Sequence, residues 1–347
     1  MEARKPITVV GGGLAGLTLG IGLRQRGIPV TVWEAGKYPR HRVCGEFISG
    51  RGQGVLTRLG LREKIMQNGA ISARTTAFFS QKMASKICVL PEPAWSVSRF
   101  VLDDLLAREF RDLGGELHEN ERWRGTEFAE GMICATGRRA KSVADNWRWF
   151  GLKIHARNVP LTADLEMHVS PNGYMGMSWL ANGEVNICGL FRRPANAGEP
   201  AAGWQETLRG EAGSLRHERL RNAVFDEDSF CSVAGLSLAP RRAAALGECS
   251  IGDAITMIPP VTGNGMSMAF ESAEMAIEPL VRYSEGKCSW LEARQNIARR
   301  CDKAFAGRLA WAGWLQRMMF RSRLQTALVL CIPRWQWLWR FLLERTR

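Results

Sequence analysis

Three glycines near the amino terminus have the spacing of a phosphate-binding turn. They follow the β-rich run at residues 7–10 and precede a stretch with helical periodicity. In such a unit the first glycine permits a tight turn, the second lets the backbone approach a pyrophosphate, and the third lets helix and strand pack closely. The first amides of the helix then face the phosphates. The pattern predicts a dinucleotide site at Gly11, Gly13, Leu14, Ala15 and Gly16.

An acidic residue stands where this unit needs one. Glu34 ends the second β-rich run and lies eighteen residues after Gly16, where its carboxylate can accept hydrogen bonds from an adenosine ribose. The short helical connection predicts that the two strands are parallel neighbours with a right-handed crossover. Strand, helix, second strand and acid together favour a nucleotide site over a glycine-rich turn without function, but they do not distinguish NAD from FAD.

A second segment far along the chain favours FAD. Residues 249–276, CSIGDAITMIPPVTGNGMSMAFESAEMA, place Asp253 after a strand and Gly263 and Gly265 at the start of a helix. Paired with the amino-terminal glycine motif, this segment resembles the single-Rossmann FAD-dependent oxidoreductases that include p-hydroxybenzoate hydroxylase, the flavin halogenases and the geranylgeranyl reductases. The resemblance covers about residues 5–285, and it is greatest with the geranylgeranyl-reductase-like branch.

The resemblance implies roles for four residues. In that superfamily the aspartate matching Asp253 binds the ribityl chain, although an aspartate here could also serve only as a helix cap. Gly265 and Met266 match the helix start that lies beside the flavin pyrimidine edge, where the helix dipole stabilises the anionic reduced ring. Arg99 matches a position that contacts the phosphate region of the cofactor.

The electron donor is less defined by the residues. Thr136 stands where hydroxylases and reductases of this superfamily carry the acid of an Asp-Gly pair, and the chain has no second G-x-G-x-x-G motif. We therefore expect NAD(P)H to bind transiently as the reductant, or another donor to replace it.

Cys44 and Gly45 belong to a Cys-Gly-Glu segment that resembles the Cys-Gly-Gly segment of geranylgeranyl reductases and implies a cysteine beside the flavin. Two roles are open for Cys44. The favoured one is that Cys44 and Gly45 are small, so that the flavin ring can approach the backbone. The other is a catalytic thiol, for which the sequence shows no paired base. We expect no metal site.

Tyr174 is a second candidate catalytic residue. Pro171-x-x-Tyr174 matches the beginning of the reductase substrate motif, but Gly176 and Trp179 depart from the rest of it. A core tyrosine beside a turn is an equal alternative. The WQWLW run at 335–339 lacks the Ile-Pro ending of the halogenase motif and lies too late in the chain, which argues against halogenation.

The pattern of elements predicts an α/β fold. We expect a Rossmann-type FAD-binding domain, an inserted and mostly antiparallel β-sheet substrate domain, and a helical carboxyl-terminal region. Residues 54–69 predict one helix. The expected limits are 1–75, 96–150 and 231–290 for the FAD-binding domain, 76–95 and 151–230 for the sheet, and 291–347 for the basic Arg/Trp-rich region.

Composition limits the other functions. The nine cysteines include no C-x-x-C pair, which favours reduced thiols, and the absence of an apolar leader favours a cytoplasmic protein. Residues 299–347 carry eleven of the Lys and Arg residues against Asp302 and Glu344, together with five tryptophans. This composition suits either contact with the inner face of a membrane or a helical cap on the protein body. We expect no nucleic acid partner, because no binding motif accompanies the charge.

These observations predict an FAD-dependent oxidoreductase. The preferred reaction is reduction of a carbon–carbon double bond in a hydrophobic prenyl or polyketide-derived substrate. The alternative is a monooxygenase that hydroxylates an aromatic or polyketide substrate, and a less favoured one is a non-catalytic flavin-binding protein that docks to a membrane.

Overall fold

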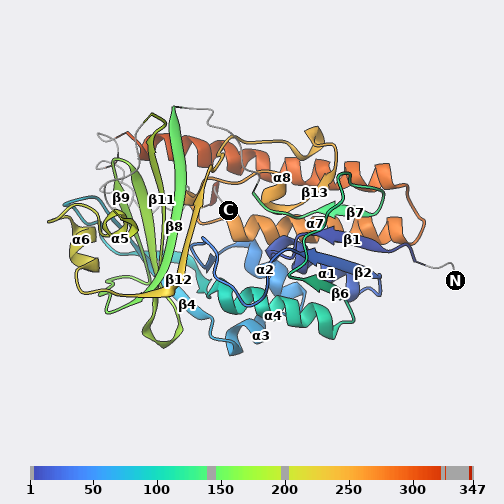
Figure 1. Ribbon diagram of the computed structural model, residues 1–347, viewed down its shortest axis with the longest axis horizontal. Helices are drawn as coiled ribbons and strands as arrows, with labels where there is room; N and C mark the ends of the chain where they lie inside the picture. The colour runs from blue at the N-terminus through green and yellow to red at the C-terminus, as the bar shows by residue number, and fades with distance from the viewer. Residues whose placement is uncertain (1–3, 139–145, 197–202, 322–324, 326–343, 346–347) are drawn as a thin grey trace.

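The computed structural model describes residues 4–138, 146–196, 203–321, 325 and 344–345. These residues form two β-sheets that lie side by side and are joined by helices, with the larger sheet at the left of Figure 1 and the smaller at the right. The expected α/β class, with a parallel nucleotide-binding sheet, a second mostly antiparallel sheet and carboxyl-terminal helices, is confirmed.

The smaller sheet, called here the parallel sheet, has the strand order β13-β7-β1-β2-β6, and every neighbouring pair is parallel. Its central strands are apolar because helices cover both faces. Ile7, Val9 and Val32 are fully buried. The strands are β1 (Ile7–Val10), β2 (Val30–Glu34), β6 (Glu116–Glu119), β7 (Met132–Cys134) and β13 (Cys249–Ser250).

Helix α1 (Leu14–Arg24) connects β1 to β2 and packs between α4 (Arg99–Asp112) and α7 (Gly265–Ser284). Two of its three glycines, Gly20 and Gly22, lie where neighbouring side chains already fill the space that a side chain would need. A Cβ on Gly20 would lie 2.8 Å from the Phe110 ring, and one on Gly22 would lie 2.3 Å from Ile277. The helix is therefore held tightly, which fixes the position of its amino terminus.

The larger sheet, called here the large sheet, has the order β12-β8-β11-β10-β9-β4-β5-β3. Its pairs are antiparallel except for β4 with β9. Tight turns at the predicted PNG and ANG sites join β9 to β10 and β10 to β11, the second with Asn182 at φ +61°. The strands are β3 (Phe47–Ile48), β4 (Ile71–Phe79), β5 (Cys88–Ser96), β8 (Trp147–Arg157), β9 (Leu165–Ser170), β10 (Gly173–Trp179), β11 (Val185–Pro194) and β12 (Val224–Ala234).

Two details differ from the expectations. Residues 54–69 do not form one helix: α2 (Arg51–Arg58) ends before Gly60, whose φ of +73° cannot continue a helix, and α3 (Arg62–Gln67) starts after it. Strands of the large sheet also extend past the ranges 76–95 and 151–230, because β4, β8 and β12 cross these limits. The predicted domain limits otherwise stay a prediction.

Helix α8 (Trp290–Met319) lies along both sheets at the top of Figure 1. Ser289 and Glu292 form a capping box at its start. Its Arg308 makes two 2.7 Å hydrogen bonds to Glu271 of α7, and its Gln316 accepts one from Tyr174 of the large sheet. The two short helices α5 (Trp204–Arg209) and α6 (Leu215–Leu220) flank the large sheet.

The expected helical region at 291–347 is observed as far as Met319, and Trp335, Trp337 and Trp339 lie outside the described residues. Within the described part of the chain, no helix combines the length and apolar character that crossing a bilayer requires. The expected contact with a membrane surface stays a prediction.

Candidate functional site

A cavity of about 1140 Å³, called here the first cavity, lies between the parallel sheet and the large sheet. It opens at the carboxyl ends of β1, β2 and β7, where Val10, Glu34 and Cys134 line it. Ligands of open α/β sheets bind at this edge. Gly16 does not line the cavity. The other predicted site residues do: Gly11, Gly13, Leu14, Ala15, Glu34, Cys44, Gly45, Arg99, Tyr174, Asp253, Gly263, Gly265 and Met266.

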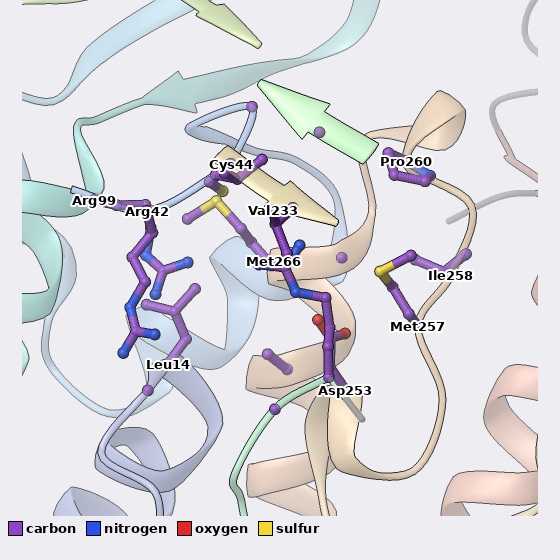
Figure 2. A pocket seen from close by; sticks show the side chains of 18 of the residues that line it. Leu14, Arg42, Cys44, Arg99, Val233, Asp253, Met257, Ile258, Pro260 and Met266 are labelled. Carbon is purple, nitrogen blue, oxygen red and sulfur yellow. The ribbon is translucent and has the colours of Figure 1, made fainter. Parts of the chain in front are cut away.

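Residues far apart in the sequence face one another across this space. Figure 2 shows Arg42 and Arg99 on one side of it and Met257 on the other, with Cys44 and Asp253 between them. The amino-terminal glycine turn and the segment around residue 253 therefore meet at one cavity, as a bound dinucleotide requires.

The three glycines of the turn have three different geometries. Gly11 has φ +114°, and a Cβ there would lie 2.2 Å from the carbonyl oxygen of Ala135. A Cβ on Gly16 would lie 1.9 Å from the Gly11 carbonyl oxygen, whereas one on Gly13 would meet no atom within 4 Å. Gly13 is therefore open toward the cavity, and its backbone is free for a phosphate to approach, while Gly11 and Gly16 serve the turn and the packing.

Two helices begin at the cavity without side-chain caps. The N-cap of helix α1 is Gly13, which has no side chain. The N-cap of α7 is Asn264, whose side chain does not bond a first-turn amide. Among the described residues, the buried Asn264 Nδ2 has no hydrogen-bond partner. Uncapped amides and the positive ends of two helix dipoles suit an anionic pyrophosphate at α1 and an electron-rich ring edge at α7.

Glu34 is tightly held where the turn meets the cavity. Its carboxylate accepts hydrogen bonds from the amides of Gly12 at 3.0 Å and Gly36 at 2.8 Å. Arg40 lies 2.5 Å and Arg42 3.6 Å from its oxygens. Binding a ribose hydroxyl therefore involves sharing this carboxylate with two arginines.

Arginines around the cavity are the main feature that the sequence reasoning missed. For Arg40 and Arg42 the sequence signal is the short basic run at residues 40–42. The position of this run in the sequence does not show that it lies beside the cofactor motifs in the fold. Arg99 was predicted, and it also forms a bidentate pair with the buried Asp103, with bonds of 2.6 and 2.8 Å. A bidentate partner fixes the guanidinium beside the cavity. The lining arginines are Arg40, Arg42, Arg99, Arg122 and Arg138.

These cations suit the two negative charges of a pyrophosphate. They also act on Asp253: burial raises the pKa of its carboxyl, and Arg138 and Arg99 partly offset this. Glycine cradle, uncapped helices and arginines together fit FAD, with Gly13, Leu14 and Ala15 at the phosphates, Glu34 at the ribose, and Asp253 at the ribityl chain.

The loop that follows Cys44 is anchored by a buried carboxylate. Glu46 has a left-handed backbone (φ +54°), which glycine adopts more easily, and its side chain is fully buried. The carboxylate accepts hydrogen bonds from the Arg99 amide at 2.9 Å and from His155 Nε2 at 2.7 Å. The buried Lys153 Nζ lies 3.6 Å away. Although burial acts to raise it, the His155 hydrogen bond and the Lys153 charge hold the pKa of Glu46 below its usual value.

The same cluster has the composition of a metal site. One ligand atom each of His41, Glu46 and His155 lies within 4.8 Å of the others. The Lys153 ammonium, however, lies 3.0 Å from His41 Nδ1 and already places a positive charge among them. We interpret the group as a buried ion-pair network that fixes the loop, since a divalent cation beside Lys153 would be repelled.

Cys44 lies at the cavity beside this network. Burial raises the pKa of its thiol, and the nearby Arg99 only partly opposes this, so the thiol is neutral near pH 7. Its Sγ accepts a hydrogen bond from the Glu46 amide at 3.4 Å. Gly45 has open space where a side chain would be. This geometry suits the role in which small residues admit a ring, because an activated thiol has a lowered pKa.

The large sheet forms the opposite wall of the first cavity, and this wall is apolar. Tyr174 lies in it as predicted, but its hydroxyl donates to Gln316 Oε1 at 3.0 Å, and burial raises the pKa of the phenol. The phenol is therefore neutral, and its proton is held by another side chain. The apolar lining residues from this sheet include Phe78, Leu165, Met167, Val169 and Leu190.

Comparisons with known proteins agree with this geometry. Residues 4–164 match the family described as FAD binding domain. A menaquinone reductase of Mycolicibacterium smegmatis is 26% identical over 330 residues, which cover 80% of this chain and 76% of that protein. Conditioned medium factor receptor 1 of Dictyostelium discoideum is 22% identical over 327 residues, and the match spans 81% of this chain but only 64% of the receptor.

Solved structures share the fold at low identity. PqsL of Pseudomonas aeruginosa, crystallised with 2-aminobenzoylacetate, has a TM-score of 0.71 at 14% identity and covers 92% of this chain and 97% of its own. The flavin-dependent brominase Bmp2 has a TM-score of 0.73 at 16% identity, with coverage of 98% and 93%. Residues 4–164, a little under half of the chain, are therefore similar to an FAD binding domain, and the glycine cradle and the fold agree with an FAD-dependent oxidoreductase.

Proposed function

We propose that this protein reduces a carbon–carbon double bond in a hydrophobic prenyl or polyketide-derived substrate. The observation that carries the proposal is the apolar wall that the large sheet presents to the first cavity, which Gly45 also lines. Phe78, Met167 and Leu190 in that wall offer contact to a hydrocarbon chain and no charge that could orient a polar substrate.

The relatives support the same class. The chain shares about a quarter of its residues with menaquinone reductases of Mycolicibacterium smegmatis and Mycobacterium tuberculosis. The segment at Cys44 and Gly45 resembles that of geranylgeranyl reductases. Both observations favour reduction of an isoprenoid double bond over other flavin reactions.

The protein's own contribution is binding, orientation and exclusion of water. When bound, FAD supplies the hydride chemistry, and a nicotinamide donor, NADH or NADPH, supplies the two electrons in each turnover. The substrate double bond gains one hydride and one proton. Tyr174 carries a neutral hydroxyl on the substrate wall. This hydroxyl must break its hydrogen bond to Gln316 before it can donate its proton to substrate. Otherwise a water molecule supplies the proton.

The carboxyl-terminal region adds a second part to the proposal. Arg and Trp residues in α8 and beyond would place the protein at the inner face of a membrane, where a hydrophobic substrate is dissolved. The described part includes Trp314, which is 40% exposed. Flotation with anionic liposomes tests this part: the full chain should float and a truncation after residue 298 should not, and if neither floats the contact is excluded.

The reaction is tested with the purified FAD-loaded protein under anaerobic conditions. Bleaching of the flavin by NADH or NADPH, followed by reoxidation with a prenyl quinone, is the expected result. After any quinol has been reoxidised to quinone in air, mass spectrometry should still show a product heavier by two hydrogens, because only a reduced carbon–carbon double bond keeps them. A product heavier by one oxygen, formed only in air, would instead identify a monooxygenase. A flavin that no donor reduces would favour the non-catalytic alternative.

A further inference from the structure

A second cavity of about 940 Å³ lies between the large sheet and α8. Strands β8, β11 and β12 supply one side, and the carboxyl-terminal half of α8 supplies the other. Its described walls are rich in aromatic side chains: Trp147, Trp149, Phe150, Phe191 and Trp204. Two residues of the sequence motifs, Asn172 and Pro259, line it, but none of the predicted FAD-binding or catalytic residues does.

The two cavities share a wall. Gly151, Val233 and Leu236 line both of them. Tyr174 lines the first cavity and Gln316 lines the second, and the hydrogen bond between these two side chains crosses the wall. A molecule that fills the second cavity therefore lies within one side chain's thickness of the substrate wall of the first.

The charged residues in the described lining of the second cavity are all cationic. It includes four arginines and, within the described part of the chain, no aspartate or glutamate. Aromatic walls with only cationic partners suit an anion attached to an apolar body. The arginines are Arg148, Arg192, Arg193 and Arg317.

Two buried donors there have no acceptor. Gln316 is 6% exposed, and its Oε1 accepts from Tyr174, which leaves Nε2 without a hydrogen-bond partner among the described residues. Arg192 Nε is also buried and unpartnered within that part of the chain. Its guanidinium carbon lies 4.1 Å from the Trp147 ring centre and 4.3 Å from that of Phe320. A buried donor without an acceptor is energetically unfavourable, and a ligand oxygen would supply the missing acceptor.

We infer that the second cavity binds the anionic head group, a carboxylate or a phosphate, of an apolar molecule, with Gln316 and Arg192 as its hydrogen-bond donors. Resting on the proposed function, the inference adds that this molecule is the substrate, whose head lies in the second cavity while its apolar chain passes Val233 toward the first. The enzyme then selects amphipathic anions over neutral hydrocarbons of the same length.

Calorimetric titration of the FAD-loaded protein tests this with three probes of equal chain length: laurate, dodecyl phosphate and dodecanol. Both anions should bind roughly tenfold or more tightly than dodecanol, because a hydrogen bond to a charged group contributes about 1.5–3 kcal/mol. Equal binding of one anion and dodecanol would show that the other head group is the specific one. Equal binding of all three probes, or binding of none, overturns the inference.

Variants locate the binding. Arg192→Gln and Gln316→Leu should each weaken anion binding about tenfold and leave dodecanol binding and FAD content unchanged. Arg157→Gln is the matched control, since Arg157 is exposed on β8, outside the cavity, and loses the same charge. An equal loss in the control would mean general surface attraction and would refute the site.

Failure of this inference is distinct from failure of the proposed function. If the protein reduces a neutral prenyl quinone but does not bind the anions, only the head-group site is rejected. Anion binding that responds to both cavity variants, in a protein that reduces no double bond, keeps the site and rejects the reaction.

Discussion

The two ends of the first cavity are built in different ways. At the nucleotide end, defined by the glycine turn, Glu34 and Asp253, the site is made mainly of backbone: open amides, two uncapped helix starts and glycines that leave space. At the sheet end, defined by Phe78, Met167, Val169, Tyr174 and Leu190, it is made of side chains, one or two from each strand.

This difference separates two kinds of mutational effect. Backbone geometry tolerates little change, so substitutions at the nucleotide end should alter folding or cofactor content. Side chains on a rigid sheet can change without altering the backbone, so substitutions at the sheet end should alter substrate choice. The buried network at Glu46 lies at the junction of the two ends, where a change should affect both.

The largest effect should come from Gly16→Ala. A Cβ there would lie 1.9 Å from a backbone oxygen that cannot move without opening the turn. We expect a loss of about 3 kcal/mol or more in the free energy of unfolding, measured by urea denaturation of the apo-protein. Gly247→Ala is the control, because Gly247 is exposed and has no neighbour within 4 Å of its Cβ position. Two equally stable variants would contradict the described turn.

A loss of similar size should follow Glu46→Gln at the junction. The substitution leaves the buried Lys153 without its carboxylate, and breaking a buried ion pair by removing one partner costs about 3–5 kcal/mol. Urea denaturation measures the loss, and the FAD absorption spectrum should shift because the Cys44–Gly45 loop loses its anchor. Glu184→Gln, on the partly exposed side of the same network, should cost much less. A larger loss in the Glu184 variant would show that the network is not held from Glu46.

Gly13→Ala should separate binding from folding. The added methyl group meets no protein atom within 4 Å, so the free energy of unfolding of the apo-protein should fall by only about 1 kcal/mol, the cost of placing alanine at an N-cap. The methyl group would occupy the space where a pyrophosphate approaches the backbone, and we expect FAD affinity to fall about a hundredfold, or about 2.7 kcal/mol. Fluorescence titration of apo-protein with FAD measures this. Unchanged affinity would place the phosphates elsewhere.

How much the sequence predicts follows the same division. The glycine turn and Glu34 lie in one contiguous motif whose spacing carries its geometry, and the resemblance to single-Rossmann FAD-dependent oxidoreductases implied that Asp253 and the start of α7 meet the same cofactor. The contact of Lys153 and His155 with Glu46 could not be predicted, because it depends on the register of β8 against the rest of the large sheet. The break at Gly60 was missed because a glycine in an otherwise periodic helix pattern is ambiguous until its φ is known.

A pH effect should be measurable at the junction. Burial and the Lys153 charge lower the pKa of His41 from 6.5 to about 4. Between these values the unfolded chain binds a proton that the folded protein does not, so the free energy of unfolding should fall as the pH falls from 6.5 toward 4. Glu166, with its pKa lowered to about 2, contributes stability that is lost only below about 4.5.

Between pH 6.5 and 5 the decline comes from His41 together with His168, because burial lowers the pKa of both imidazoles. His41→Asn keeps an oxygen that can accept from Lys153 but removes the titration, so the decline of stability over this range should become shallower. His118→Asn is the control, since His118 lies on β6 away from the network. An unchanged slope in the His41 variant would assign the decline to another group.

The smallest effect should come from Cys44→Ala, and its size decides between the two roles that the sequence left open. The thiol is neutral, and its contacts with the Glu46 amide and the Arg99 side chain are weak. A residue that is there because it is small can be replaced by a smaller one, so kcat should stay within about twofold of the wild type. If Cys44 instead transfers a proton or attacks substrate, removing its thiol should lower kcat by about 10²-fold or more. With Cys288→Ala as the control for cysteine removal far from the cavity, a fall of that size at Cys44 alone would make the thiol part of the chemistry.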